Sequence, residues 1–172
     1  ALNSGNDKQA IQPSLLIHPD GRWQMLARDR RRRGNVWSTW SSDQGKTWSE
    51  LASTGLPNPS SGTDAVTLAD GRQLLVYNHT QRPSDEASIG SSRRMLNVAV
   101  SDDGDIGQRP WVLKARDGDS PYPAVIQTAD GLVHITYTWD RNSIRHVVVD
   151  PKKLDLRPIV NGKWPASAGQ GQ

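Results

Sequence analysis

Hydrophobic and polar residues along this chain alternate over short runs. Within residues 132–138, Val133, Ile135 and Tyr137 alternate with histidine and threonine, so the apolar side chains of an extended strand would lie on one face. No segment sustains a 3.6-residue apolar period over the length of a helix. The pattern therefore predicts an all-β protein made of short strands.

Three segments repeat one layout, in which an apolar strand runs into Asp-Gly and a second apolar strand follows. The Asp-Gly pairs are Asp20-Gly21, Asp70-Gly71 and Asp130-Gly131. Asp-Gly between two strand-like runs is a strong hairpin signal, because a tight two-residue turn of this kind needs positive φ at both positions. The repeat predicts three similar β-hairpins.

Each predicted hairpin is followed by a third strand, and a fourth is available after it. The third strands are expected at 35–41, 95–101 and 143–150, and the fourth around 48–51, 111–114 and 154–159. Four-stranded antiparallel sheets in series are typical of a β-propeller. We expect a partial β-propeller of about three four-stranded antiparallel blades. The blades are expected at 11–55, 60–116 and 120–160, between an N-terminal tail (1–10) and a flexible C-terminal tail (161–172).

The composition limits which kinds of catalytic or metal site the chain can contain. Seven Trp with no Phe, in a chain that is 34% hydrophobic, fit short strands anchored by large aromatic side chains. The absence of Cys excludes disulfides, thiolate metal sites and a Cys nucleophile. The four histidines have no metal-binding spacing, so we expect no metal or cofactor. We expect surface or strand positions for His18, His79, His134 and His146.

The net charge of +3 is concentrated in the run Arg28–Gly34. The run is interpreted as a solvated hairpin tip, with recognition of an anionic ligand as the second reading. It lacks interleaved aromatic residues, so no nucleic-acid partner is expected. No apolar run approaches the roughly 18 residues of a membrane span, and no membrane partner is expected. The sequence does not indicate a compartment.

A spaced motif follows the third strand of the first unit. Its residues are Ser41, Asp43, Gly45, Thr47 and Trp48, and a degraded copy retains Ser101, Asp103 and Trp111. The Ser and Asp side chains can satisfy turn amides, and Trp can pack under the hairpin. The motif resembles the Asp box of the sialidase (neuraminidase) superfamily. In that family the boxes lie on the outer rim, so the resemblance implies a structural role.

The repeat register predicts a ligand site at one end of the sheets. Eight residues before each Asp-Gly stand Gln12, Gly62 and Tyr122. Eight residues after each Asp stand Arg28, Asn78 and Thr138. Antiparallel pairing places both sets at the same end of each sheet. A ring of varied polar residues there is what a binding site would look like.

The sialidase resemblance implies roles for several of these residues. Arg28 and Arg94 match arginines that hold the substrate carboxylate, and Tyr122 matches the nucleophile that attacks the anomeric carbon. Asn78 lies at the position equivalent to Arg28. Gln12 stands where the family has a Glu base, and an amide cannot take a proton from a phenol of pKa about 10. The acid Asp and the third Arg of the family belong to its N-terminal half.

Four segments resemble bacterial sialidase-like glycosyl hydrolases with neuraminidase-type (BNR) repeats more closely. They are "NPSSGTDAV", "LLVYN", "YPAVIQTADGLVHITYTW" and "RHVVVDP", within residues 10–151. On this match Asp64 is a site carboxylate: an acid or base if burial raises its pKa, or an orienting hydrogen-bond acceptor. The structural alternatives are a strand-entry residue for Asp64, a basic-loop residue for Arg28, a solvated side chain for Arg94 and a buried anchor for Tyr122.

The resemblance implies that the three blades are half of a six-bladed sialidase-like propeller. It also implies a sialidase-like glycoside hydrolase that is exo-acting on anionic or sialic-acid-type sugars, present as an incomplete, half-length unit. The alternative is a non-catalytic module for glycan binding or assembly. Three blades leave raw sheet edges and apolar blade faces, which are unusual for a monomer. Besides a carbohydrate, we expect a second copy or a missing N-terminal half as partner.

Overall fold

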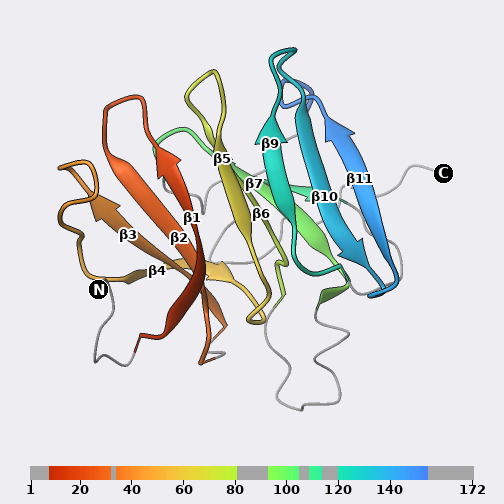
Figure 1. The fold of residues 1–172 in the computed structure, drawn as a ribbon, viewed down its shortest axis with the longest axis horizontal. Helices are drawn as coiled ribbons and strands as arrows, with labels where there is room; N and C mark the ends of the chain where they lie inside the picture. Colours follow the sequence, from red (N-terminus) through yellow and green to blue (C-terminus); the bar gives the residue numbers. More distant parts are fainter. Residues whose placement is uncertain (1–7, 32–33, 81–92, 105–108, 114–119, 155–172) are drawn as a thin grey trace.

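Three antiparallel sheets lie side by side in chain order (Figure 1). The computed structural model describes residues 8–31, 34–80, 93–104, 109–113 and 120–154. The first sheet contains β1 (Ala10–Ile17), β2 (Trp23–Asp29), β3 (Asn35–Ser41) and β4 (Ala52–Pro57). The second contains β5 (Asp64–Thr67), β6 (Gln73–Tyr77), β7 (Leu96–Ser101) and β8 (Arg109–Leu113), and the third β9 (Ala124–Gln127), β10 (Val133–Trp139) and β11 (Ser143–Val149). The predicted all-β partial propeller is confirmed, and it is not closed.

The predicted hairpins are present, but their turns differ from the expected type. In the first, His18 N donates to the Arg22 carbonyl (2.9 Å) and Gly21 N donates to the His18 carbonyl (3.0 Å), which encloses three residues. Gly21 has φ 85°, whereas Asp20 is not at positive φ. The turns are therefore three-residue loops with glycine in the left-handed position. The Asp side chain stabilises the turn by a hydrogen bond: Asp20 Oδ1 accepts from the Arg22 amide at 3.0 Å.

The fourth strands follow the predicted order with one correction. In the first sheet β4 begins at Ala52, so the expectation of a strand around 48–51 was wrong. Residues 48–51 lie between the Asp-box turn and β4: Trp48 Nε1 donates to the Gly45 carbonyl at 3.0 Å, and the Ser49 amide donates to the Trp40 carbonyl at 2.8 Å. In the second sheet β8 lies where predicted. The third sheet has three strands among the described residues, and most of 154–159 and both expected tails lie outside them.

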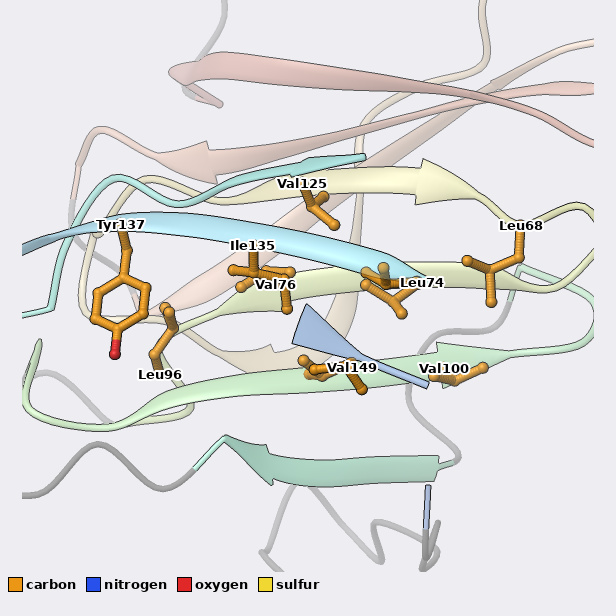
Figure 2. Packing of buried hydrophobic residues seen from close by; sticks show 11 residues of the cluster. Leu68, Leu74, Val76, Leu96, Val100, Val125, Ile135, Tyr137 and Val149 are labelled. Atoms are coloured by element: carbon orange, nitrogen blue, oxygen red, sulfur yellow. The ribbon is translucent and has the colours of Figure 1, made fainter. Parts of the chain in front are cut away.

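Each boundary between sheets is filled by an apolar cluster. Between the first and second sheets, Leu16, Leu26 and Val36 pack against Leu75 and Tyr77. The larger cluster, between the second and third sheets, is shown in Figure 2 and includes Leu74, Val76, Leu96, Val125, Ile135, Tyr137 and Val149. Every blade thus uses its neighbour to bury one face, as expected for stacked repeats.

Two histidines are buried, contrary to the expectation of surface or strand positions. His18 is 4% exposed, lies just past the end of β1, and packs its ring on Trp40 at 4.8 Å between centroids. Burial lowers the pKa of His18, and its hydrogen bond to Gln24 acts in the opposite direction. His79 is 7% exposed and its Nδ1 hydrogen-bonds the buried hydroxyl of Tyr77. Both histidines lie just past the ends of strands, so the alternation of apolar and polar residues within a strand could not predict their burial.

The Asp-box residues of the first sheet form a closed hydrogen-bond set. Ser41 Oγ donates to Asp43 Oδ1 (2.8 Å) and accepts from the Gly45 amide (2.8 Å). Asp43 also accepts from the Thr47 amide (2.8 Å) and hydroxyl (2.6 Å). These bonds, that of the Thr47 hydroxyl first, lower the pKa of Asp43 from its ordinary 3.8 to about 2. The degraded copy keeps the Ser101 to Asp103 bond at 2.9 Å.

We expect Thr47→Val to raise the pKa of Asp43 toward its usual range, because the hydroxyl donor is lost while the backbone amide remains. Since the folded-state pKa is depressed, the box stabilises the fold above about pH 4 and this contribution is lost as pH falls toward 2. Carboxyl NMR titration measures the change. Thr47→Ser, which keeps the hydroxyl, serves as the control and should leave the pKa near 2. Equal pKa values in the two variants would contradict the assignment.

Candidate functional site

The sheet ends opposite the Asp-Gly turns bring the register-equivalent residues together. We call this end the mouth; it comprises residues 11–13, 28, 58–64, 78, 93–95 and 120–123. A Cβ placed on Gly62 would lie 3.2 Å from Tyr122 Cδ1 and 3.5 Å from Gln12 Oε1. One residue from each blade therefore meets at one point. Thr138 lies at the same end, since its amide donates to the Pro121 carbonyl at 3.1 Å.

Three non-glycine residues at the mouth have a left-handed backbone. They are Gln12 (φ 52°), Ser60 (φ 61°) and Tyr122 (φ 57°). Such residues are uncommon, and they cluster at functional sites where the surrounding structure holds them. Tyr122 is also 49% exposed. It is therefore not the buried anchor that was the structural alternative.

Arg28 extends from the end of β2 across the boundary between the first two sheets. Its Nη1 donates to the Ser60 carbonyl at 2.8 Å. Its Nε is buried and has no hydrogen-bond partner within the described part of the chain. Burial lowers the pKa of Arg28, Tyr122 acts in the opposite direction, and the positive charge of Arg93 lowers it further. Arg28, Arg93 and Tyr122 are thus electrostatic neighbours.

Arg93, rather than Arg94, is the second arginine of this group. Arg94 is exposed, whereas Arg93 is half-buried and its Nε is buried without a hydrogen-bond partner. The count back from the box serine had pointed to Arg94, and the role of Arg94 in substrate binding stays a prediction.

Asn78 holds backbone segments of the mouth together through hydrogen bonds. Its side chain is fully buried. Its Nδ2 donates to the carbonyls of Met95 (2.8 Å), Arg93 (3.2 Å) and Ser120 (3.4 Å). The structure thus places Asn78 where it fixes the backbone that carries Arg93, and away from the exposed surface of the mouth.

Asp64 joins all three sheets. Its Oδ1 accepts from the Ser14 hydroxyl (2.8 Å) and from the Ala65 amide (2.9 Å). Its Oδ2 accepts from the Val125 amide at 2.8 Å. Ser14 and Val125 lie two and three residues beyond Gln12 and Tyr122. Of the roles considered for Asp64, an orienting hydrogen-bond acceptor agrees best with these contacts.

Buried polar atoms without partners gather near the mouth. Among the described residues, eight such side-chain atoms lie there: Arg28 Nε, Asn58 Nδ2, Ser61 Oγ, Thr63 Oγ1, Asn78 Oδ1, Arg93 Nε, Asn97 Nδ2 and Ser120 Oγ. Native proteins leave few buried polar groups unpaired, and each calls for water or a ligand. The concentration of cationic and neutral donors suits an anionic ligand that also carries hydroxyl groups.

Two searches of the described residues bear on other kinds of site. No three histidine, aspartate or glutamate side chains converge there as metal ligands. Nor does that part of the chain contain an apolar helix of the length a bilayer crossing requires.

The family model for the BNR repeat-like domain matches residues 2–135, which is more than half of the chain. No curated protein sequence matches the chain significantly.

Solved structures share the fold at low sequence identity. The intramolecular trans-sialidase of Ruminococcus gnavus, in complex with oseltamivir carboxylate, matches 90% of this chain with TM-score 0.63 and 15% identity. A Hadza microbial sialidase matches 84% with TM-score 0.62 and 22% identity. A putative exo-β-1,3-galactanase of Bifidobacterium bifidum matches 93% with TM-score 0.55 and 15% identity. The chain spans only 35%, 28% and 55% of these three proteins, respectively.

Proposed function

The chain belongs to the BNR repeat-like domain family, and from this membership and the geometry of the mouth we propose a sialidase-like unit that binds the carboxylate of an anionic sugar. The observation that carries the proposal is the pair Arg28 and Arg93. Each has a buried Nε that finds no hydrogen-bond partner among the described residues, and the charge of Arg93 acts on Arg28, as does Tyr122. An anion between two guanidinium groups relieves their repulsion and takes charge-assisted hydrogen bonds from both.

The remaining mouth residues fit a sugar ring. The exposed ring of Tyr122 offers an apolar face. Its hydroxyl acts electrostatically on Arg28, so a carboxylate held by Arg28 would bring the neighbouring substrate atoms toward Tyr122. In a sialidase-like reaction this oxygen attacks the anomeric carbon, and a neutral nucleophile avoids repulsion by the substrate carboxylate. We propose exo-acting hydrolysis of sialic-acid-type or related anionic glycosides as the activity of the complete site.

Gln12 and Asp64 favour a second candidate function, a non-catalytic module for glycan binding. Gln12 meets Tyr122 across Gly62 but cannot accept the phenol proton. Asp64 accepts three hydrogen bonds from the protein itself. Gln12 therefore does not supply the base and Asp64 is engaged within the protein, whereas carboxylate binding needs only Arg28 and Arg93.

We expect Arg93→Met to weaken binding of N-acetylneuraminic acid by about 10- to 100-fold, because hydrogen bonds to charged groups contribute about 1.5–3 kcal/mol. Arg28→Met should behave in the same way. The matched control is Arg94→Met, whose affinity should stay within about twofold of the parent because Arg94 is exposed. Isothermal titration calorimetry measures all three, with glucuronic acid and uncharged galactose as comparison ligands. Equal losses at Arg93 and Arg94, or equal binding of galactose, would sink the carboxylate site.

Turnover separates the two candidate functions. The chain is incubated with a fluorogenic sialoside and with a panel of uronic-acid glycosides. Hydrolysis that Tyr122→Phe abolishes supports the enzyme, whereas carboxylate-dependent binding without hydrolysis supports the module. Hydrolysis that persists in Tyr122→Phe would remove Tyr122 from the mechanism.

A further inference from the structure

One buried loop contacts both Arg28 and Tyr122, the two groups that the proposed function places beside the substrate. The loop is residues 58–63, which connect β4 to β5 and are all buried. Its Ser60 carbonyl accepts from Arg28 Nη1 at 2.8 Å. Two residues further on, a Cβ placed on Gly62 would lie 3.2 Å from Tyr122 Cδ1. A single segment of the second blade therefore lies against a group from the first blade and a group from the third.

Ser60 has a backbone conformation that is unfavourable for serine. Its φ is 61°, in the left-handed region where residues other than Gly, Asn and Asp are uncommon. Pro59 precedes it, and proline followed by a positive φ is the pattern of a type II turn, whose third position is usually Gly or Asn. Asn58 fixes the loop from its other end: Oδ1 accepts from the Ser61 amide and the Asn58 amide donates to the Gly34 carbonyl, both at 2.8 Å. The loop thus keeps Ser60 in a conformation that its own side chain disfavours.

The Ser60 carbonyl is well suited to orient the guanidinium of Arg28. Among the described residues it is the one acceptor that is hydrogen-bonded to this guanidinium. A guanidinium carries five N–H donors in a planar fork, so an acceptor on Nη1 fixes the plane and leaves Nε and Nη2 for a planar anion. A main-chain carbonyl is also neutral. It therefore orients Arg28 without neutralising the positive charge, as a carboxylate of the protein would.

We propose that Ser60 is a positioning residue that acts through its main chain: its left-handed backbone turns the carbonyl toward Arg28 Nη1 and so orients the guanidinium for the substrate carboxylate. The inference rests on the proposed function, because that function assigns Arg28 to the carboxylate. A donor that is ordered before binding loses less conformational freedom when the ligand arrives, so its orientation raises affinity without a new contact. The side-chain hydroxyl of Ser60 takes no part.

Substitutions at Ser60 separate the backbone from the hydroxyl. Ser60→Gly removes the hydroxyl but adopts positive φ readily, so affinity for N-acetylneuraminic acid should stay within about twofold of the unsubstituted chain. Ser60→Thr keeps a hydroxyl but its branched Cβ opposes positive φ. Its affinity should fall about tenfold, as when one hydrogen bond to a charged group is weakened. Ser60→Ala is a milder change and should lie between the two.

Isothermal titration calorimetry measures this series, and an Arg28→Met background shows whether Ser60 acts through Arg28. In that background Ser60→Thr should cause no further loss of affinity, because the guanidinium that it orients is gone. The control for backbone strain alone is Gln44→Thr in the Asp-box turn, since Gln44 has φ 59°, and its affinity should equal that of the unsubstituted chain. Full affinity in Ser60→Thr, an equal loss in Ser60→Gly, or additive losses with Arg28→Met would each overturn the proposal.

A measurement without ligand distinguishes failure of this inference from failure of the proposed function. NMR relaxation of the Arg28 Nε–H group reports how ordered the guanidinium is. The group should be ordered in the unsubstituted chain, in Ser60→Gly and in Gln44→Thr, and more mobile in Ser60→Thr. If the chain binds N-acetylneuraminic acid no better than galactose, the proposed function fails, whereas these relaxation differences still support the orientation of Arg28 by Ser60. Equal mobility in Ser60→Gly and Ser60→Thr overturns the inference whatever the ligand result.

Discussion

Replacing Gly104 with alanine should lower the free energy of unfolding by about 3 kcal/mol, one of the largest effects we expect from a single methyl group in this chain. Gly104 has φ +88°, where an L-residue is strained. The added Cβ would also lie 2.7 Å from His18 Cε1 and 2.9 Å from Trp40 Cζ2. Those rings belong to the first sheet, so the substitution forces the first two sheets apart.

A matched glycine separates strain from crowding. Gly131 has nearly the same backbone angle, φ +83°, but no atom lies within 4 Å of its hypothetical Cβ. Gly131→Ala should therefore lose only the conformational term, about 1 kcal/mol. Urea unfolding followed by circular dichroism measures both variants. Equal losses would mean that the contact of Gly104 with Trp40 and His18 does not hold the sheets together.

The same contact shows why the degraded Asp box matters although its motif has decayed. The Gly104 carbonyl accepts from Gln24 Nε2 of the first sheet at 2.9 Å. Gln24 in turn hydrogen-bonds His18 at 3.1 Å. The second box therefore closes the boundary between two blades, a role that depends on the glycine and not on the missing threonine.

Sequence reasoning succeeded where structure is decided by neighbouring residues. The Asp-Gly hairpins and the third strands were predicted because a few consecutive residues determine them. The turn type was missed because the Asp side chain caps the amide two residues on, which removes the need for positive φ at that position. The expectation of a strand around 48–51 was wrong because strand β4 begins only at Ala52. Trp48 Nε1 donates instead to the carbonyl of Gly45 in the preceding turn.

The site was predictable only as far as the repeat register reaches. Counting from each Asp-Gly brought Gln12, Gly62 and Tyr122 to one point, which the structure shows in contact. The count back from the box serine pointed to Arg94, whereas the structure brings the side chain of Arg93 beside Arg28; the burial that distinguishes two adjacent arginines cannot be read from their spacing. Nor could it reveal contacts between blades, which join residues 50 or more positions apart.

Asp64→Ala should destabilise the chain by about 3 kcal/mol and also weaken ligand binding at the mouth. The carboxylate accepts hydrogen bonds from Ser14, Ala65 and Val125. Bonds to charged groups contribute about 1.5–3 kcal/mol each, and their loss leaves partly buried donors unpaired. Because Ser14 and Val125 lie two and three residues beyond Gln12 and Tyr122, losing these bonds should let the two mouth residues separate.

A graded series decides whether Asp64 acts as a link between blades. Ser14→Ala removes one donor and should lose about 1 kcal/mol. Asp64→Asn can still accept from Ser14 and Ala65 through Oδ1, but it turns an amide donor toward the Val125 amide, so its loss should fall between the other two. Ser14→Ala should add little in the Asp64→Ala background, because both act on the same bond. Urea unfolding gives the four values, and full additivity would show that Ser14 and Asp64 stabilise their blades independently.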